Sequence, residues 1–132
     1  MIAAQRVAKI FERLVKLSEN KRAKMSHAER IIWYVVTARC ATDMDGFNSV
    51  FEQTFKEDEL NLLIAGLQYI DEKDLSKAFA RCRKLLAAER YFEHYDWNKV
   101  PEPVKKKIAK IGDVVGDRLW DFDEKLDALV SG

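Results

Sequence analysis

The sequence is poor in the residues that mark disulfide-rich, metal-bound or loop-rich proteins. Its 132 residues include two Cys, two His, two Pro and five Gly. So few Gly and Pro argue against an all-β or disordered chain, in which turn-forming residues are frequent. The two Cys are not in a CxxC pair, so neither a disulfide scaffold nor a zinc ribbon is expected. We predict a helix-rich globular protein without a metal or a cofactor.

Long apolar stretches are also missing. The longest candidate, residues 31–36, is far shorter than the roughly 20 residues of a membrane-spanning helix. The first six residues lack the basic and apolar regions of a secretory signal. We therefore expect a soluble, cytoplasmic protein that has no contact with a membrane. Its length fits one domain, residues 1–132.

Catalytic signatures are absent as well. There is no GxSxG, P-loop, GxGxxG or HExxH sequence, and His27 and His94 lie far apart, so we predict no catalytic residues and no enzymatic activity. Cys40 and Cys82 fall on apolar faces and are expected to be reduced and buried, with a disulfide or a reactive thiol as alternatives. A triad of His94, Asp96 and one Cys is the least favoured alternative.

Charge is distributed unevenly along a chain whose net charge is only +1. Residues 1–30 carry eight basic and three acidic side chains, residues 31–112 carry thirteen of each, and residues 113–132 carry two basic and six acidic. If both ends lie on one side of the fold, these charges can pair within the chain or across a dimer. If the ends lie apart, the surface is dipolar.

Apolar residues recur at helical spacing through most of the chain, which predicts an all-α fold. We expect a compact single-domain bundle of about six or seven helices. Two of them, separated only by the acidic sequence at residues 71–74, should form a central helical hairpin. The expected helical stretches cover residues 7–17, 26–42, 47–51, 60–70, 75–86, 101–112 and 113–130.

Short polar sequences predict where the helices begin. Ser26 with Glu29 has the form of a capping box, and Thr54 with Glu57 repeats it. The acid at residue 71 is expected at the start of the second hairpin helix, where it would face the free amides of the first turn.

Three glycines carry predictions of their own. Gly46 can take a positive φ at the break after the second long helix. Gly66 is expected to permit close approach of a neighbouring helix. Gly112 is expected to end the helix that Pro101 begins.

The last expected helix, residues 113–130, has an acidic outer face. Side chains three or four residues apart lie about 6 Å apart on a helix, similar to successive phosphates of a nucleic-acid strand. A continuous helix would therefore present an anionic track to a basic groove. An ordinary solvated face is the alternative, and Gly116 threatens the continuity of the helix. The candidate partner-binding residues are Asp113, Asp117, Asp121, Asp123, Glu124 and Asp127.

Residues 91–97 contain four aromatic side chains. Such a segment can be a connector whose rings cover one end of the core, because aromatic side chains bury much area. It can also be a hot spot for a protein partner. On the second interpretation, Tyr91, Tyr95 and Trp97 are candidate contact residues.

Direct nucleic-acid binding is a weaker hypothesis. Basic residues occur in the first helix, at residues 21–24 and at residues 105–110. The overall charge is balanced, however, and no nucleic-acid-reading motif is present. We therefore expect a protein partner and no direct contact with nucleic acid.

Residues 45–51 have the sequence Asp-Gly-Phe-Asn-Ser-Val-Phe, which resembles the Gly-Gly-Phe-x-x-x-Phe turn-helix segment of the DNA-mimic protein domain family. The resemblance covers the chain from near Glu29 onward. It continues through residues 67–70 and Ala78, and ends in residues 119–126, which resemble the Leu-Asp-x-x-Phe sequence at the end of that family. The first Gly of the family segment is Asp in this chain.

The resemblance implies an all-helical domain that forms a homodimer and uses surface carboxylates to imitate DNA phosphates. The chain departs from this pattern in its net charge, because attraction to a DNA-binding groove requires strong negative charge. We expect a non-enzymatic protein-interaction module that binds a basic surface of a DNA-binding regulator through its acidic final helix. The alternative is an immunity or antitoxin protein that neutralises a partner toxin.

Overall fold

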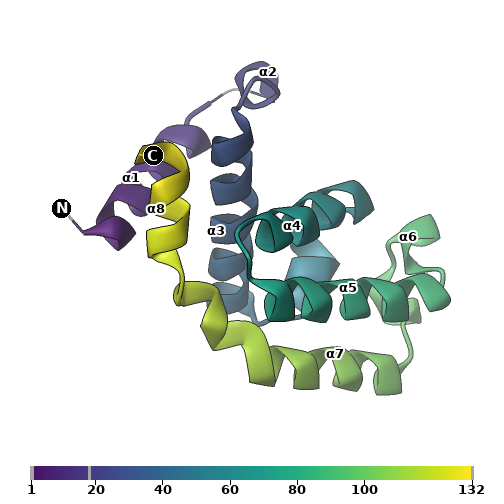
Figure 1. Ribbon diagram of the computed structural model, residues 1–132. Coiled ribbons are helices and arrows are strands. Elements are labelled where there is room, and N and C mark those ends of the chain that lie inside the picture. Colours follow the sequence, from purple (N-terminus) through teal and green to yellow (C-terminus); the bar gives the residue numbers. More distant parts are fainter. Residues whose placement is uncertain (1, 18, 132) are drawn as a thin grey trace.

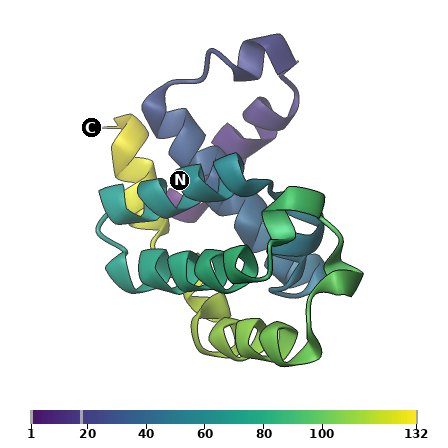
Figure 2. The same cartoon turned by 90° about the vertical axis from the view of Figure 1, so that its right-hand side faces the viewer.

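The computed structural model describes residues 2–17 and 19–131, in which every regular element is helical (Figures 1 and 2). Six α-helices of nine or more residues make up most of these residues, which confirms the expected all-α bundle. The elements are α1 (Ala3–Val15), α2 (Glu19–Arg22), α3 (His27–Asp45), the π-helix η1 (Val50–Thr54), α4 (Glu57–Tyr69), α5 (Lys73–Ala88), α6 (Tyr91–His94), the 3-10 helix η2 (Trp97–Lys99), α7 (Glu102–Val115), the 3-10 helix η3 (Gly116–Trp120) and α8 (Asp123–Ser131).

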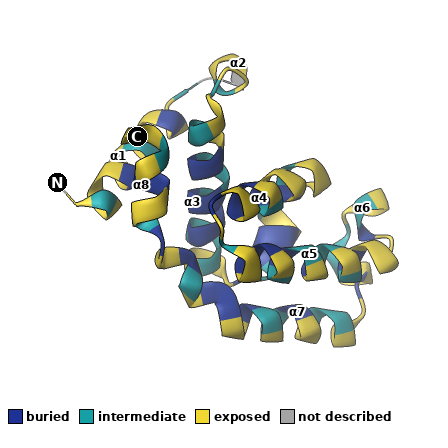
Figure 3. Cartoon of the chain, in the orientation of Figure 1, coloured by how far each residue is buried: buried dark blue, intermediate teal, exposed yellow. Residues whose placement is uncertain are grey.

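Helix α3 runs through the middle of the bundle (Figure 1). Helices α1 and α8 lie together on one side of it, and α4 and α5 lie on the other side, with α7 alongside α5. Fully buried side chains from all six of these helices belong to one apolar cluster, and burying each contributes about 1.5–3 kcal/mol (Figure 3). Those with no exposed surface include Leu14, Ile32, Leu63, Phe79, Ile108 and Leu126.

The first predicted capping box is confirmed. Ser26 Oγ accepts a hydrogen bond from the Glu29 N–H at 3.1 Å, and the Glu29 carboxylate accepts one from the Ser26 N–H at 2.9 Å. The bond from the Ser26 backbone lowers the pKa of Glu29 below its usual value. These bonds satisfy two of the amides left free at the start of α3.

The second predicted capping box is wrong. Thr54 ends η1, and the residue before α4 is Lys56, whose N–H donates to the Glu59 carboxylate at 3.2 Å. The chain straightens at Phe55, which has extended backbone angles and only 6% of its surface exposed. Because this ring is buried on extended backbone, α4 begins later in the sequence than a cap at Thr54 would place it.

The central hairpin is confirmed as α4 and α5. Its turn is closed by a hydrogen bond from the Glu72 N–H to the Leu67 carbonyl at 2.8 Å, with Asp71 in the left-handed region at φ 62°. Asp71 is thus a turn residue and not the predicted cap of α5. Gly66 permits the expected close approach, since a Cβ there would lie 3.3 Å from Ile31 Cγ1 on α3.

The two other glycine predictions have different outcomes. Gly46 follows α3 with φ 89°, as predicted, and its N–H donates to the Thr42 carbonyl at 3.1 Å. Gly112 does not end a helix, because α7 continues to Val115. Gly112 instead permits close contact with Phe47, whose Cγ would lie 2.5 Å from a Cβ built there.

The oppositely charged ends of the chain meet. Helices α1 and α8 pack on each other, and the Arg6 guanidinium donates to both carboxylate oxygens of Asp127 at 2.8 Å and 2.7 Å. The expected charge complementarity therefore acts at least in part within one chain. In the described residues, no helix is long and apolar enough to cross a membrane.

Candidate functional site

The predicted acidic helix is interrupted, which corrects the expectation of one continuous track of carboxylates. Asp113 lies near the end of α7, Asp117 lies in η3, and the remaining candidates lie after η3 or in α8. The buried Arg39 of α3 donates through Nε to the Leu119 carbonyl. In a continuous helix that carbonyl would accept the N–H of Asp123, so the side chain replaces a helical hydrogen bond.

Two of the predicted contact residues face inward. Asp123 Oδ1 lies 2.6 Å from Arg39 Nη1, and Asp127 is 7% exposed against Arg6. The hydrogen bond from Arg6 is the main cause that lowers the pKa of Asp127 below its usual value. These two carboxylates hold helices together. The predicted residues that remain exposed are Asp113, Asp117, Asp121 and Glu124.

The aromatic segment covers one end of the core, as the first interpretation proposed. Tyr91 has no exposed surface, and its hydroxyl donates to the Phe51 carbonyl at 2.9 Å. Tyr91 is therefore unable to contact a partner, contrary to its place among the candidate residues. Tyr95 is 40% exposed and its hydroxyl accepts the Glu57 N–H, while Trp97 is half-buried.

The thiols and imidazoles do not assemble a reactive site. Cys40 and Cys82 are free thiols, and burial raises the pKa of both, to about 12 for Cys82. A reactive cysteine has a lowered pKa, which neither thiol shows. Cys82 is buried, as expected, whereas Cys40 is only half-buried. His94 Nδ1 accepts the Asp96 N–H at 2.9 Å. No group of three or more potential metal ligands occurs in residues 2–17 and 19–131.

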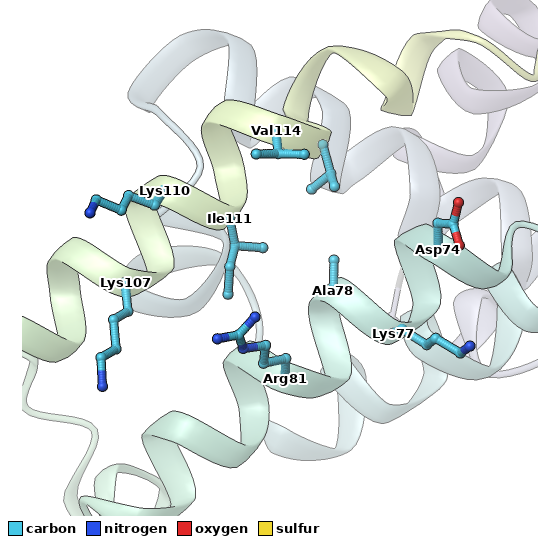
Figure 4. Close-up of a pocket in the computed structure, with 9 residues that line it drawn as sticks. Asp74, Lys77, Ala78, Arg81, Lys107, Lys110, Ile111 and Val114 are labelled. Carbon is cyan, nitrogen blue, oxygen red and sulfur yellow. The ribbon is translucent and has the colours of Figure 1, made fainter.

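A groove of about 500 Å³ between α5 and α7 brings together residues that the sequence did not connect. The two helices lie side by side and run in opposite directions (Figure 1). In Figure 4, Ile111 and Ala78 point toward each other across the groove, and Arg81 reaches from α5 toward α7. The lining residues are Asp74, Lys77, Ala78, Arg81, Lys107, Lys110, Ile111, Val114 and Val115.

The groove combines an apolar floor with positive rims. Lys77 and Arg81 line the groove from α5, and Lys107 and Lys110 line it from α7. In Figure 4, Arg81 reaches toward α7, whereas the side chains of Lys77 and Lys110 extend outward from the edges of the groove. The carboxylate of Asp74 at one end lies 3.7 Å from Arg118 Nη2, so a cation of the same chain already faces it. An occupant therefore meets apolar surface flanked by cations.

The basic surface continues beyond the groove along α5. A neighbouring hollow of about 540 Å³ is lined by Lys77, Ala80, Arg81, Arg83, Lys84 and Ala87. The sequence does hold a signal for the groove, because Lys77 and Arg81 are four residues apart and Lys107 and Lys110 are three apart. Each pair alone is typical of a solvated helix face. Only the antiparallel packing of α5 on α7 brings the pairs to opposite rims of one groove.

Comparison of the chain with known protein families, with curated proteins and with solved structures found no match.

Proposed function

We propose that this protein is a non-enzymatic protein-interaction module whose groove between α5 and α7 binds an acidic, amphipathic segment of a partner protein. One observation supports this proposal above all others, namely the apolar floor of Ile111 and Ala78 between two cationic rims. A helix with apolar residues on one side and carboxylates along its flanks fits such a groove, in the helix-in-groove mode of peptide recognition.

The chemistry of the groove favours a protein partner over nucleic acid. Its lining contains no aromatic side chain on which a base could stack. The apolar floor offers nothing to a phosphate backbone, whose binding depends on many exposed cations. The net charge of +1 also gives no long-range attraction for a polyanion. An amphipathic helix with acidic flanks can bind both parts of the groove. Its apolar face would pack on the floor, and its carboxylates would pair with the cations on either side.

A labelled peptide tests the proposal directly. The probe is an amphipathic helix of 14 residues, the length of α7, with Leu on one face and Glu along both flanks. Its binding is measured by fluorescence anisotropy at low and physiological salt, beside a charge-reversed Lys peptide and a labelled DNA duplex. We expect the acidic peptide to bind best, with an affinity that falls as salt rises.

Charge reversal locates the binding. Arg81→Glu with Lys107→Glu should weaken binding of the acidic peptide about tenfold or more, since a loss of about 1.4 kcal/mol gives a factor of ten. The matched control reverses two exposed lysines outside the groove, Lys9→Glu with Lys24→Glu, and should leave the affinity within about twofold. Equal binding of both peptides, preferential binding of DNA, or equal effects of the two double variants would refute the proposal.

The exposed acidic residues support a second candidate function, binding of a basic partner such as a DNA-binding regulator or a toxin. The observation in its favour is that Trp120, 48% exposed, lies between the exposed Asp117 and Asp121 in the sequence. Aromatic residues next to charges are frequent at the centre of protein interfaces. The resemblance to DNA-mimic proteins motivates the same candidate.

The second candidate has its own test. Asp113→Asn, Asp117→Asn and Asp121→Asn together should weaken binding of a basic peptide and reduce the salt dependence of its affinity. Unchanged salt dependence would rule out this candidate and would leave the groove proposal untouched.

A further inference from the structure

A second cleft, of about 330 Å³, lies between α2, α3 and α4. Figure 1 shows α2 at the end of the bundle where α3 begins. The cleft shares no lining residue with the groove between α5 and α7. A smaller hollow of about 100 Å³ adjoins it, because Arg30, Tyr34 and Leu62 line both.

Helical spacing explains why these side chains share one wall. Arg30 and Tyr34 are four residues apart on α3, and Leu62 and Gly66 are four apart on α4, so each pair lies on one face of its helix. The two faces meet where Gly66 approaches Ile31, the pair that also lines the smaller hollow. The smaller hollow is therefore bounded by the close packing of α4 on α3.

Two guanidinium groups are held in place at the larger cleft. Arg22 Nη2 donates to the Val15 carbonyl at 3.2 Å, and the guanidinium carbon lies 4.8 Å from the centre of the Trp33 ring. Arg30 Nη2 donates to the Ala23 carbonyl at 2.9 Å. A guanidinium has five N–H donors, so each group is positioned by the protein and still has donors to offer.

These two cations lack the acidic partners that other arginines of the chain have. Arg6, Arg13 and Arg39 each form an ion pair with a carboxylate, at 2.7, 2.9 and 2.6 Å. In residues 2–17 and 19–131, no carboxylate pairs with either guanidinium of the cleft. The Nε–H of Arg22 is buried and has no acceptor in the same residues. The protein therefore leaves both cations able to bind an external anion.

The charge of the cleft selects a ligand with one negative charge. Besides the two guanidinium groups, one carboxylate lines the cleft, that of Glu59, which accepts the Lys56 N–H at 3.2 Å. The formal charge of these three groups is +1. A single carboxylate balances it, whereas a phosphate dianion or a polyanion would bring excess negative charge close to Glu59. Arginine also binds a carboxylate through two parallel hydrogen bonds.

The remaining walls are apolar or aromatic. Leu62 is 45% exposed although it is a large apolar residue, and its exposed side lines both hollows. Met25 lines the larger cleft, and the half-buried Tyr34 lines both. A ligand that covers these side chains removes apolar surface from water.

We propose that this cleft binds a small monocarboxylate with an apolar or aromatic body. The carboxylate pairs with Arg22 and Arg30, and the body lies along Tyr34 and Leu62 toward the smaller hollow. Pockets for small molecules have this composition, in which a few fixed polar groups orient a ligand on apolar walls. The proposal does not depend on the groove between α5 and α7.

Nuclear magnetic resonance titration with 4-phenylbutyrate tests the proposal. The probe is added to ¹⁵N-labelled protein, and the backbone amides of α2, α3 and α4 are followed with the indole N–H of Trp33. We expect saturable shifts confined to this cleft, with a Kd of about 1 mM or tighter for a ligand of about twelve non-hydrogen atoms. The uncharged analogue 4-phenylbutanol should bind about tenfold more weakly, and inorganic phosphate should give no saturable shift.

Variants of the cleft locate the binding. Leu62→Glu places a carboxylate at both hollows without removing a contact of α2, and should weaken binding of 4-phenylbutyrate about tenfold or more. The matched control, Gln68→Glu, adds the same charge at an exposed position of α4 outside both hollows, and should bind within about twofold of wild type. Arg22→Lys with Arg30→Lys keeps the charge but loses the paired N–H groups, and should also bind about tenfold more weakly.

The unliganded spectrum of each variant shows whether it is folded. The absence of saturable binding by wild type, or shifts that map outside the cleft, overturns the proposal. It is also overturned if 4-phenylbutanol or phosphate binds as tightly as 4-phenylbutyrate, or if folded Leu62→Glu protein binds as tightly as Gln68→Glu protein.

Discussion

Phe47 lies against the backbone of Gly112, so closely that a Cβ at residue 112 would come within 2.5 Å of the ring. Phe47 follows the turn at Gly46, and Gly112 lies in α7. This contact sets the distance between the end of α3 and the helix that forms one wall of the groove.

Gly112→Ala tests how firmly this contact positions α7. The added methyl group must displace the Phe47 ring, and we expect the free energy of unfolding to fall by about 1–3 kcal/mol despite the better helix propensity of Ala. Urea denaturation followed by circular dichroism measures the change. Gly66→Ala is the matched control, because its Cβ would lie 3.3 Å from Ile31 and requires a much smaller shift. The prediction would be contradicted if Gly112→Ala lowered the free energy of unfolding by no more than Gly66→Ala does.

Arg39→Met tests the buried cation that holds α3 against η3 and α8. Arg39 is 2% exposed, and its guanidinium contacts the Asp123 carboxylate and the rings of Trp120 and Phe122. Its loss leaves Asp123 without its cation, so we expect about 3–5 kcal/mol lower stability in urea denaturation.

The comparison for Arg39 is Arg13→Met, which breaks an ion pair with Glu29 at the surface. Exposed pairs contribute about 0–1 kcal/mol, so this variant should unfold close to wild type. The double variant Arg39→Met with Asp123→Leu should recover part of the loss, because it leaves no unpaired charge. A single Arg39 variant as stable as the Arg13 variant would show that the buried cation is dispensable.

Tyr91→Phe removes one hydrogen bond from the buried end of the aromatic segment. The Phe51 carbonyl would lose its bond from the Tyr91 hydroxyl, and we expect a loss of about 1–3 kcal/mol in thermal or urea unfolding. Tyr95→Phe serves as the control, since that hydroxyl is at the surface and water can replace it. If Tyr91→Phe and Tyr95→Phe lost the same free energy of unfolding, burial of the hydroxyl would not determine how much its hydrogen bond contributes to stability.

Acid should weaken the contact between α1 and α8. The pKa of Asp127 is lower in the folded protein than its ordinary value of 3.8, so the folded state binds this proton less readily than the unfolded chain. The contribution of the Arg6–Asp127 pair to the free energy of unfolding is therefore present at neutral pH. It is lost as the pH falls below about 4 toward the pKa of Asp127 in the folded protein. Asp127→Asn should therefore flatten the acid side of the stability profile relative to wild type. Parallel profiles for Asp127→Asn and wild type would contradict this assignment.

The helices and several of their ends could be predicted because their signals are local. The capping box at Ser26 and the positive φ of Gly46 each depend on a few neighbouring residues. Gly66 could be singled out as a glycine inside a helical period, although the residue that approaches it, Ile31 of α3, is distant in the sequence. The predicted cap at Thr54 failed because burial of Phe55, a tertiary contact, determines where α4 begins.

The groove and the interruption of the last helix could not be predicted in the same way. Arg39 lies within an apolar stretch of α3, and nothing in its neighbourhood indicates that it donates to the Leu119 carbonyl, 80 residues away. Arg81 and Lys107 likewise resemble ordinary surface residues until α5 packs on α7. Charge and periodicity locate helix faces, but only tertiary packing determines which faces meet.

The packing of α1 on α8 affects how the fold can form during synthesis. Arg6 and Asp127 are 121 residues apart, and the buried Val7 and Leu14 belong to the same core as Leu126. Until residues 123–131 have left the ribosome, the apolar face of α1 lacks one of its two neighbours. Exposed apolar surface of this kind attracts chaperones and promotes aggregation. Completion of the core is therefore coupled to release of α8 from the ribosomal exit tunnel.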